Sequence, residues 1–328
     1  MTEVLATTPG LFPLPDRAKS ALADLKGHQK DGLIDGEETG ELLEVYDRAR
    51  RDVIETQTAA GLDRIVEGQL RWDDMLAHPL CVHDRVETRG IVRYYDNNNF
   101  YREPVVRGEL TYDGDVAAEL DGAAGVDQAV LPGPYSLSDL ATDEHYGDEA
   151  ALLDGVAAFL EREADALPDV ETMFLLEPSL VADPPGDGED RRASDAIDAV
   201  AGAVPVDTDV VVHTYWGAIP EKPYAHLMDA AVDAIGFDLL ADHDRTLYNI
   251  QEYGTKPSVA LGVVDGKNTL VESPAEIAER VEWVLDNLPA ESFETIYATA
   301  NTELFYLPVN RFEAKLEALA AAPAEVDL

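Results

Sequence analysis

Cysteine, basic side chains and long apolar segments are all scarce in this sequence. A single cysteine, Cys81, stands among 328 residues, so the chain cannot form an internal disulfide bond. No stretch approaches about 18 uncharged apolar residues, which excludes a membrane-spanning helix. Residues 1–13 also lack the basic start and apolar run of a secretion signal. We therefore expect a cytoplasmic protein that does not enter a membrane.

Positive charge is equally scarce. Only 24 lysine and arginine residues oppose 66 aspartate and glutamate residues, which gives a formal net charge of -42. Such a surface repels nucleic acids and anionic membranes, so neither is an expected partner. It also repels itself, and this repulsion fades in molar salt, where the Debye length falls to about 3 Å. The charge therefore predicts a halophilic protein from a high-salt cytoplasm, with an ordinary acidic protein as the alternative.

Short apolar strands alternate with amphipathic helices over the second half of the sequence. Strands are expected at residues 172–176, 209–213 and 257–261, and a helix follows each of them. This alternation is typical of parallel βα units, about eight of which close into a barrel. Residues 85–135 differ, because their alternating pattern predicts a β-rich segment. The expected fold is α/β: a single (β/α)8 TIM barrel over residues 1–328, with an N-terminal helical extension and a β-rich insertion.

Turn and capping signals set the ends of further elements. A long helix is expected at residues 36–60, and a strand at residues 62–67 follows the helix-ending Gly61. Another helix is expected at about residues 148–166. Residues at the carboxyl ends of the strands should line the mouth of the barrel, where active sites of this fold lie.

Several short motifs resemble those of cobalamin-independent methionine synthases. The matching segments are residues 7–13 (TTPGLFP), 60–63 (AGLD), 67–75 (EGQLRWDDM), 98–106 (NNFYREPVV), 131–134 (LPGP), 176–180 (LEPSL), 261–266 (LGVVDG) and 271–274 (VESP). Each motif is short, but together they span most of the chain in the family's order. The sequence therefore resembles this family, in the form found in haloarchaea.

The resemblance implies methyl transfer to homocysteine in methionine biosynthesis, from a folate-type methyl donor or another donor. Members of the family hold a zinc ion, which keeps the homocysteine thiol as a thiolate. By this resemblance the ligand positions carry Tyr215, Gly217, Asp238 and Thr302, in place of histidine, cysteine, glutamate and cysteine. A zinc site needs three good ligands, and only Asp238 could coordinate. We therefore expect no metal and no other cofactor.

The positions that meet the amino acid in the family are changed as well. Leu11 stands in place of a serine, Gln69 in place of a glutamate and Leu176 in place of an aspartate. Full-length members carry two barrels, and the first lacks metal ligands and helps to hold the methyl donor. We therefore expect a non-zinc subunit or paralogue that assists a homologous zinc-bearing barrel and is not catalytic alone. An independent enzyme with a rebuilt metal-free mouth and a purely structural partner barrel are the alternatives.

The remaining candidate residues lie at the expected mouth. His213, Glu177 and Asp238 are the candidates for catalysis, with His213 acting either as a general base or as a structural histidine. The candidates for a ligand pocket are Gln69, Asp73, Arg102, Tyr215, Trp216 and Thr302. The two aromatic residues either fill the space of the missing metal or stack on a flat ligand such as a pterin.

Five of the 17 arginines gather in one segment of 23 residues. They are Arg85, Arg89, Arg93, Arg102 and Arg107. On so acidic a chain, this segment is expected to bind an anionic tail such as folate polyglutamate, to meet an acidic partner, or to pair with local acids.

Overall fold

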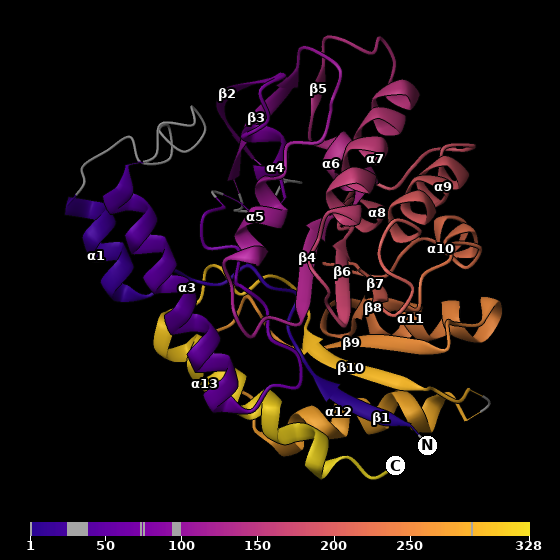
Figure 1. Ribbon diagram of the computed structural model, residues 1–328. Coiled ribbons are helices and arrows are strands. Elements are labelled where there is room, and N and C mark those ends of the chain that lie inside the picture. The colour runs from indigo at the N-terminus through magenta and orange to yellow at the C-terminus, as the bar shows by residue number, and fades with distance from the viewer. Residues whose placement is uncertain (1, 25–38, 73, 75, 94–99, 290) are drawn as a thin grey trace.

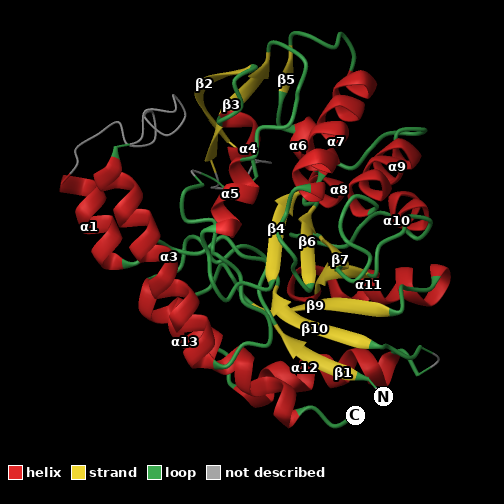
Figure 2. Cartoon of the chain, in the orientation of Figure 1, coloured by secondary structure: helices red, strands yellow, loops and turns green. Residues whose placement is uncertain are grey.

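A curved parallel sheet of seven strands forms the centre of the computed structural model (Figure 1), which describes residues 2–24, 39–72, 74, 76–93, 100–289 and 291–328. In order across the sheet, the strands are β1 (Glu3–Ala6), β10 (Thr295–Ala300), β9 (Ser258–Val264), β8 (Ala234–Asp238), β7 (Asp209–His213), β6 (Thr172–Leu176) and β4 (Gln128–Pro132). All neighbouring strands pair in parallel. Helices cover the outer side of the curved sheet (Figure 2).

The strands form because their sequences are short apolar runs. Every residue of β4, β6, β8 and β9 is buried. Parallel strands covered on both faces need such continuous apolar sequences, since one face packs on helices and the other fills the interior of the curved sheet. Strand β4 falls within residues 85–135, which were expected to form a β-rich insertion, but it belongs to the main sheet.

The outer helices follow the strands along the chain. They are α7 (Glu149–Asp165), α8 (Ser179–Ala182), α9 (Asp190–Ala201), α10 (Glu221–Leu227), α11 (Leu239–Tyr253), α12 (Pro274–Asn287), α13 (Val309–Ala321) and the 3-10 helix η1 (Ala322–Glu325). The N-terminal extension adds α1 (Asp16–Asp24) and α3 (Gly40–Ala60), which pack against each other, and α3 also packs against α13. None of the described helices combines the length and the apolar character that crossing a bilayer requires.

Residues 62–67, which were expected to be a strand, do not form a regular strand. Val66 makes one isolated parallel bridge to Gln128 of β4, and the amide of Asp63 donates to the carbonyl of Ala6 on β1 at 3.0 Å. The side chain of Gln57 accepts a hydrogen bond from the amide of Val66 at 3.0 Å and donates one to its carbonyl at 2.7 Å. These two backbone groups are therefore not available to a neighbouring strand. In the described residues the expected eight-stranded barrel is therefore only a seven-stranded, curled sheet with this segment between its edges.

The expected β-rich insertion is a separate small sheet. It contains β2 (Val86–Arg93), β3 (Phe100–Val106) and β5 (Thr142–Asp143), seen at the top of Figure 1. Three short helices connect it to the main sheet: α4 (His78–Cys81), α5 (Asp115–Asp121) and α6 (Pro134–Asp139). Strands β2 and β3 pair antiparallel, with a register shift between Thr88 and Ile91.

Candidate functional site

The four positions that the resemblance assigns to a metal lie at the carboxyl ends of strands β7, β8 and β10, of which β7 and β8 are neighbours and β10 is separated from β8 by β9. Tyr215 and Gly217 follow β7, Asp238 ends β8 and Thr302 follows β10. Tyr215, Asp238 and Thr302 are all buried, with at most 1% of each exposed. The sequence therefore identified residues that lie at the carboxyl ends of the strands, but the side chains of these residues are enclosed.

Asp238 is fully engaged in hydrogen bonds. Its Oδ1 accepts from the backbone amides of Leu240 (3.1 Å) and Ala241 (3.0 Å) and from the side-chain amide of Asn301 (3.0 Å). Its Oδ2 accepts from the backbone amide of Trp216 at 2.9 Å. Burial raises the pKa of Asp238, while these four donors oppose the rise. The carboxylate thus caps the N-terminus of α11, and coordinating a metal would disrupt that cap.

The other three positions offer no good zinc ligand. Burial, and then the charge of Glu303, raises the pKa of Tyr215 well above its usual range, so its phenol stays neutral. The hydroxyl of Thr302 donates to the carbonyl of Glu303 at 3.3 Å, and Gly217 has no side chain. Zinc sites are built from thiolate, imidazole and carboxylate groups. The residues at these positions therefore do not fit a zinc ion.

His213 is the last residue of β7, and its ring is locked in place. Its Nε2 lies 3.2 Å from the carbonyl oxygen of Ala300, and its Nδ1 has no hydrogen-bond partner in the described part of the chain. A Cβ added to Gly236 would lie 2.2 Å from Nδ1, so the ring packs directly against this glycine. Burial lowers the pKa of His213 to about 4. A neutral, enclosed ring favours the structural role, and the role of general base stays a prediction.

Glu177 follows β6 and binds the N-terminus of α6. Its Oε1 accepts from the amide of Tyr135 at 2.9 Å, and its Oε2 accepts from the amide and hydroxyl of Ser136 at 2.8 and 2.6 Å. Gly133 permits this approach, because a Cβ there would lie 2.1 Å from the carboxyl carbon. Burial raises the pKa of Glu177 to about 7, against the effect of these three donors. The contacts favour a structural role for this candidate.

Three mouth loops contain residues in the left-handed backbone region. Among the described residues, the non-glycine residues with positive φ are Leu11 (59°), Gln69 (48°) and Trp216 (67°). Leu11 and Gln69 are also joined, since the amide of Leu11 donates to Oε1 of Gln69 at 2.9 Å. Such conformations cost about 1–3 kcal/mol each and gather at functional sites. Leu11 and Gln69 are also positions where the resemblance gives a replaced residue. Two of these strained loops therefore carry substitutions at the mouth.

The indole of Trp216 is half-buried at the mouth. The ammonium of Lys267 lies 5.1 Å from the centre of its ring, and the ring of Tyr215 lies 5.7 Å away. A cation above an indole face is a favourable contact. Stacking of a pterin on this indole stays a prediction, as does a ligand role for Arg102. The candidate Asp73 lies outside the described residues.

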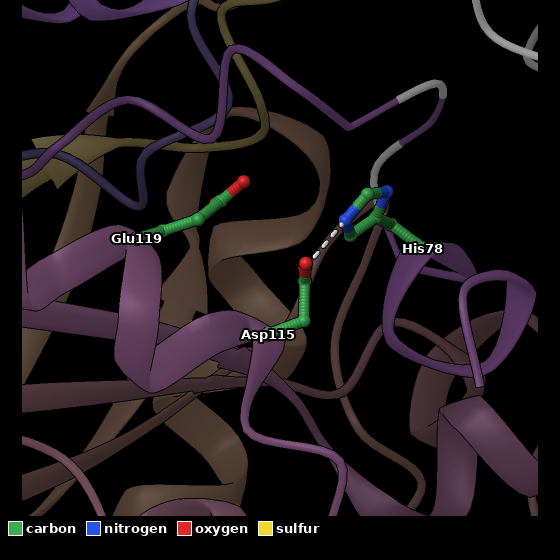
Figure 3. A group of neighbouring side chains, drawn as sticks. All are labelled: His78, Asp115 and Glu119. Carbon is green, nitrogen blue, oxygen red and sulfur yellow. Dashed lines mark hydrogen bonds and ion pairs between the residues drawn. The ribbon is translucent and has the colours of Figure 1, made fainter. Parts of the chain in front are cut away.

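A buried ionic cluster near the mouth was not identified from the sequence. It contains His78, Asp115 and Glu119, whose potential ligand atoms lie within 4.8 Å of one another (Figure 3). Nε2 of His78 lies 3.0 Å from Asp115, and Arg71 forms ion pairs with both Asp115 and Glu119. Despite burial, His78 and Arg71 lower the pKa of Asp115 to about 2. The guanidinium of Arg71 already supplies the positive charge that a metal would bring.

The comparisons with known proteins agree on one family. A family model described as "Cobalamin-independent synthase, N-terminal domain" matches residues 82–288. The methionine synthase of Saccharolobus solfataricus is 24% identical over 295 residues, covering 87% of this chain and 84% of the relative. That of Sulfolobus acidocaldarius is 24% identical over 260 residues, covering 76% and 74%.

Two solved structures share the fold. A B12-independent methionine synthase from Shewanella sp. W3-18-1, in complex with selenomethionine, superimposes with a TM-score of 0.74 at 20% identity, covering 98% of this chain and 96% of that one. A putative vitamin-B12-independent methionine synthase from Listeria monocytogenes has a TM-score of 0.71 at 16% identity, covering 99% and 98%. The similarity therefore extends over nearly the whole fold.

Proposed function

Because this chain belongs to the cobalamin-independent synthase family, we propose that it is a non-zinc subunit or paralogue that assists a homologous zinc-bearing barrel in methionine biosynthesis. The observation that carries the proposal is the state of Asp238, whose two carboxylate oxygens receive four hydrogen bonds. This is the one position of the expected ligand set with a suitable side chain, and it serves as a helix cap. The match to the family's N-terminal domain supports the same division of labour.

The proposed assistance is to hold the folate-type methyl donor or to support the shape of the catalytic barrel. The half-buried Trp216 supports the first role, because it offers an aromatic surface at the mouth. The enclosed side chains of His213 and Tyr215 support the second, since they fill the mouth and expose no reactive atom. In this proposal residues 62–67 take the place of the eighth barrel strand.

An independent enzyme receives less support from the geometry. It would need an accessible base, whereas His213 and Glu177 are both fully buried. Their hydrogen bonds to backbone groups also hold them in fixed positions. Turnover of a small molecule by the isolated chain would support this second candidate function.

The proposal is tested by co-expressing the chain in high salt with a homologue whose zinc ligands are intact. We expect the two to co-purify, and we expect methionine formation by the homologue to increase when this chain is present. This chain alone should show no homocysteine turnover. Turnover by the isolated chain would overturn the proposal, and so would the absence of both association and any effect on the homologue.

Direct binding of homocysteine provides a second test. Leu11, Gln69 and Leu176 leave the charged groups of the amino acid without the partners that the family supplies. A buried charge without a partner costs several kcal/mol, and each 1.4 kcal/mol is about tenfold in affinity. Calorimetric titration should therefore show a dissociation constant in the millimolar range or weaker. Micromolar binding would show that the amino-acid pocket is intact.

A further inference from the structure

A positively charged side chain covers the half-buried indole at the mouth. The Nζ of Lys267, in the loop between β9 and α12, lies 5.1 Å from the centre of the Trp216 ring. Lys267 itself is exposed. A cation in this position is attracted by the indole face, and it also keeps other flat groups off that face. The surface on which a ligand could stack is therefore occupied by the chain itself.

Lys267 differs from the other lysines that the structure describes. Three of them, Lys19, Lys222 and Lys315, form ion pairs with carboxylates, and Lys256 donates to two backbone carbonyls. Within the described residues Lys267 has no carboxylate partner, although the chain carries a net charge of -42. Its position over the indole is therefore not a by-product of pairing with a nearby acid.

The loop that carries Lys267, residues 265–272, has a firmly bound base. Glu272 accepts from the backbone amide of Asp265 at 2.9 Å and pairs with the buried Lys315 at 2.6 Å. The ammonium of Lys315 also donates to the carbonyl of Leu270 at 2.6 Å. One buried ion pair therefore fixes both ends of the loop.

The tip of the same loop, residues 267–269, is exposed and bound locally. The amide of Lys267 donates to Oδ1 of Asp265 at 2.9 Å, and Oδ1 of Asn268 accepts from the amide of Leu270 at 3.0 Å. Both of these hydrogen bonds lie within the loop itself. Exposed segments held by local hydrogen bonds open at a low free-energy cost. The tip can therefore lift Lys267 from the indole while the base stays in place.

The indole on the other side of the contact is held at its backbone. Trp216 has a φ of 67°, in a region that non-glycine residues rarely adopt, and its amide donates to Oδ2 of Asp238 at 2.9 Å. The ring of Tyr215 lies beside it, at 5.7 Å between ring centres. Opening of the contact therefore requires movement of Lys267 rather than of Trp216.

We propose that Lys267 is a latch: its ammonium covers the indole of Trp216 in the free protein and moves aside when a flat ligand stacks there. The inference rests on the proposed function, because it takes this indole to be the surface that receives the folate-type methyl donor. A cation over an exposed indole is equivalent to about two- to fivefold in a binding constant. Such a contact is weak enough for a ligand to displace, and it lowers the affinity for that ligand by the same factor.

The first measurement is acrylamide quenching of the fluorescence of Trp216 in the full-length chain at high salt. Each protein is compared with its own Trp216→Phe counterpart, which leaves Trp72 and Trp283 as the emitting residues. Lys267→Ala should raise the quenching constant of Trp216, because the indole face loses its cover. The matched control is Lys19→Ala, which removes the same charge from an exposed site in α1 and should leave the constant unchanged. An unchanged constant in Lys267→Ala would overturn the latch.

The second measurement is calorimetric titration with pterin, a flat and uncharged probe. The absence of charge matters, since an anionic probe would also respond to the loss of an ammonium group. Lys267→Ala should bind pterin about two- to fivefold more tightly than the wild type, whereas Lys19→Ala should bind it like the wild type. Both substitutions alter exposed side chains, so thermal melts should show the same folded protein.

The outcomes separate the latch from the proposed function. Equal binding of pterin by the wild type and by Lys267→Ala would overturn the latch and leave the donor-holding role standing. Weaker binding by Lys267→Ala would also overturn the latch, because the ammonium would then hold the ligand instead of covering its site. No binding of pterin by either protein would overturn the donor-holding role, and the latch with it.

Discussion

The side-chain amide of Asn301 donates a hydrogen bond to Oδ1 of Asp238 at 3.0 Å, joining the end of β8 to the loop after β10. The carbonyl oxygen of the same Asn301 side chain accepts from the amide of Gly266 at 2.9 Å, so a third loop is tied to the pair. One neutral amide therefore connects three loops at the place where the resemblance expects a metal.

We predict that the purified protein holds no stoichiometric zinc after extensive dialysis. The triple variant Tyr215→His, Gly217→Cys, Thr302→Cys should retain about one zinc per chain, because one imidazole and two thiolates suffice for a catalytic zinc site. A Cβ at position 217 would lie 3.1 Å from a methyl group of Val181, which a small shift relieves. Elemental analysis of both proteins decides the matter, and tightly bound zinc in the wild type would contradict the prediction.

Folding should depend on salt. With 66 acidic residues against 24 basic ones, the folded state repels itself until ions screen the charge. Thermal melts in about 0.1 M and about 2 M KCl should differ by more than about ten degrees, in favour of the higher salt. Equal melting temperatures would exclude halophilic adaptation as the reason for the charge.

Glu177→Gln should destabilise the fold by about 1–3 kcal/mol, because the amide nitrogen of glutamine would face a backbone N–H donor of α6. The wild-type pKa of Glu177 is raised from 4.5 to about 7. The native state therefore binds more protons than the unfolded state between these values, and this contribution to stability is lost as the pH rises through about 7. Urea titrations at a series of pH values should show a shallower pH dependence for the variant.

The exposed Glu44→Gln serves as the control for that series. Its stability curve should coincide with that of the wild type. If Glu177→Gln also coincides with the wild type at every pH, then the carboxyl of Glu177 does not hold α6.

Arg71→Ala should destabilise the protein by about 3–5 kcal/mol, because it removes the guanidinium that pairs with the buried carboxylate of Glu119 and the partly buried carboxylate of Asp115. The matched control is Arg191→Ala, which removes an exposed ion pair to Asp195 within α9 and should change stability little. Denaturant unfolding measures both. Equal stability of the two variants would contradict the prediction.

The sequence predicted the elements whose ends carry strong local signals. The strands at residues 172–176 and 209–213 were predicted at their observed bounds, and a helix was predicted after the strand at 257–261. The helix at 274–287 begins with a capping box, in which Ser273 and Glu276 bond each other's backbone, and such pairs are visible in a sequence. The segment at 62–67 was wrong as a strand, because its backbone groups pair with the side chains of Gln57 and Asp127 instead of with a full strand ladder.

The candidate site was predictable only in part, for the same physical reason. The motif positions placed Tyr215, Asp238 and Thr302 at the carboxyl ends of the strands of the sheet, where the structure has them. However, the donors that satisfy Asp238 come from backbone groups and from Asn301, and no spacing reveals them. The cluster around Arg71 combines residues of separate helices that meet only in the folded chain.

The pairing of β1 with β10 has a consequence for how the chain folds during synthesis. Glu3 aligns with Thr295, so the partner of the first strand is made almost last. Until then β1 cannot take its place, and the free edge of β10's neighbour β9 stays open. Contacts so distant in sequence form slowly and leave strand edges exposed to other chains. The seven-stranded sheet can therefore be completed only after β10 has been synthesised.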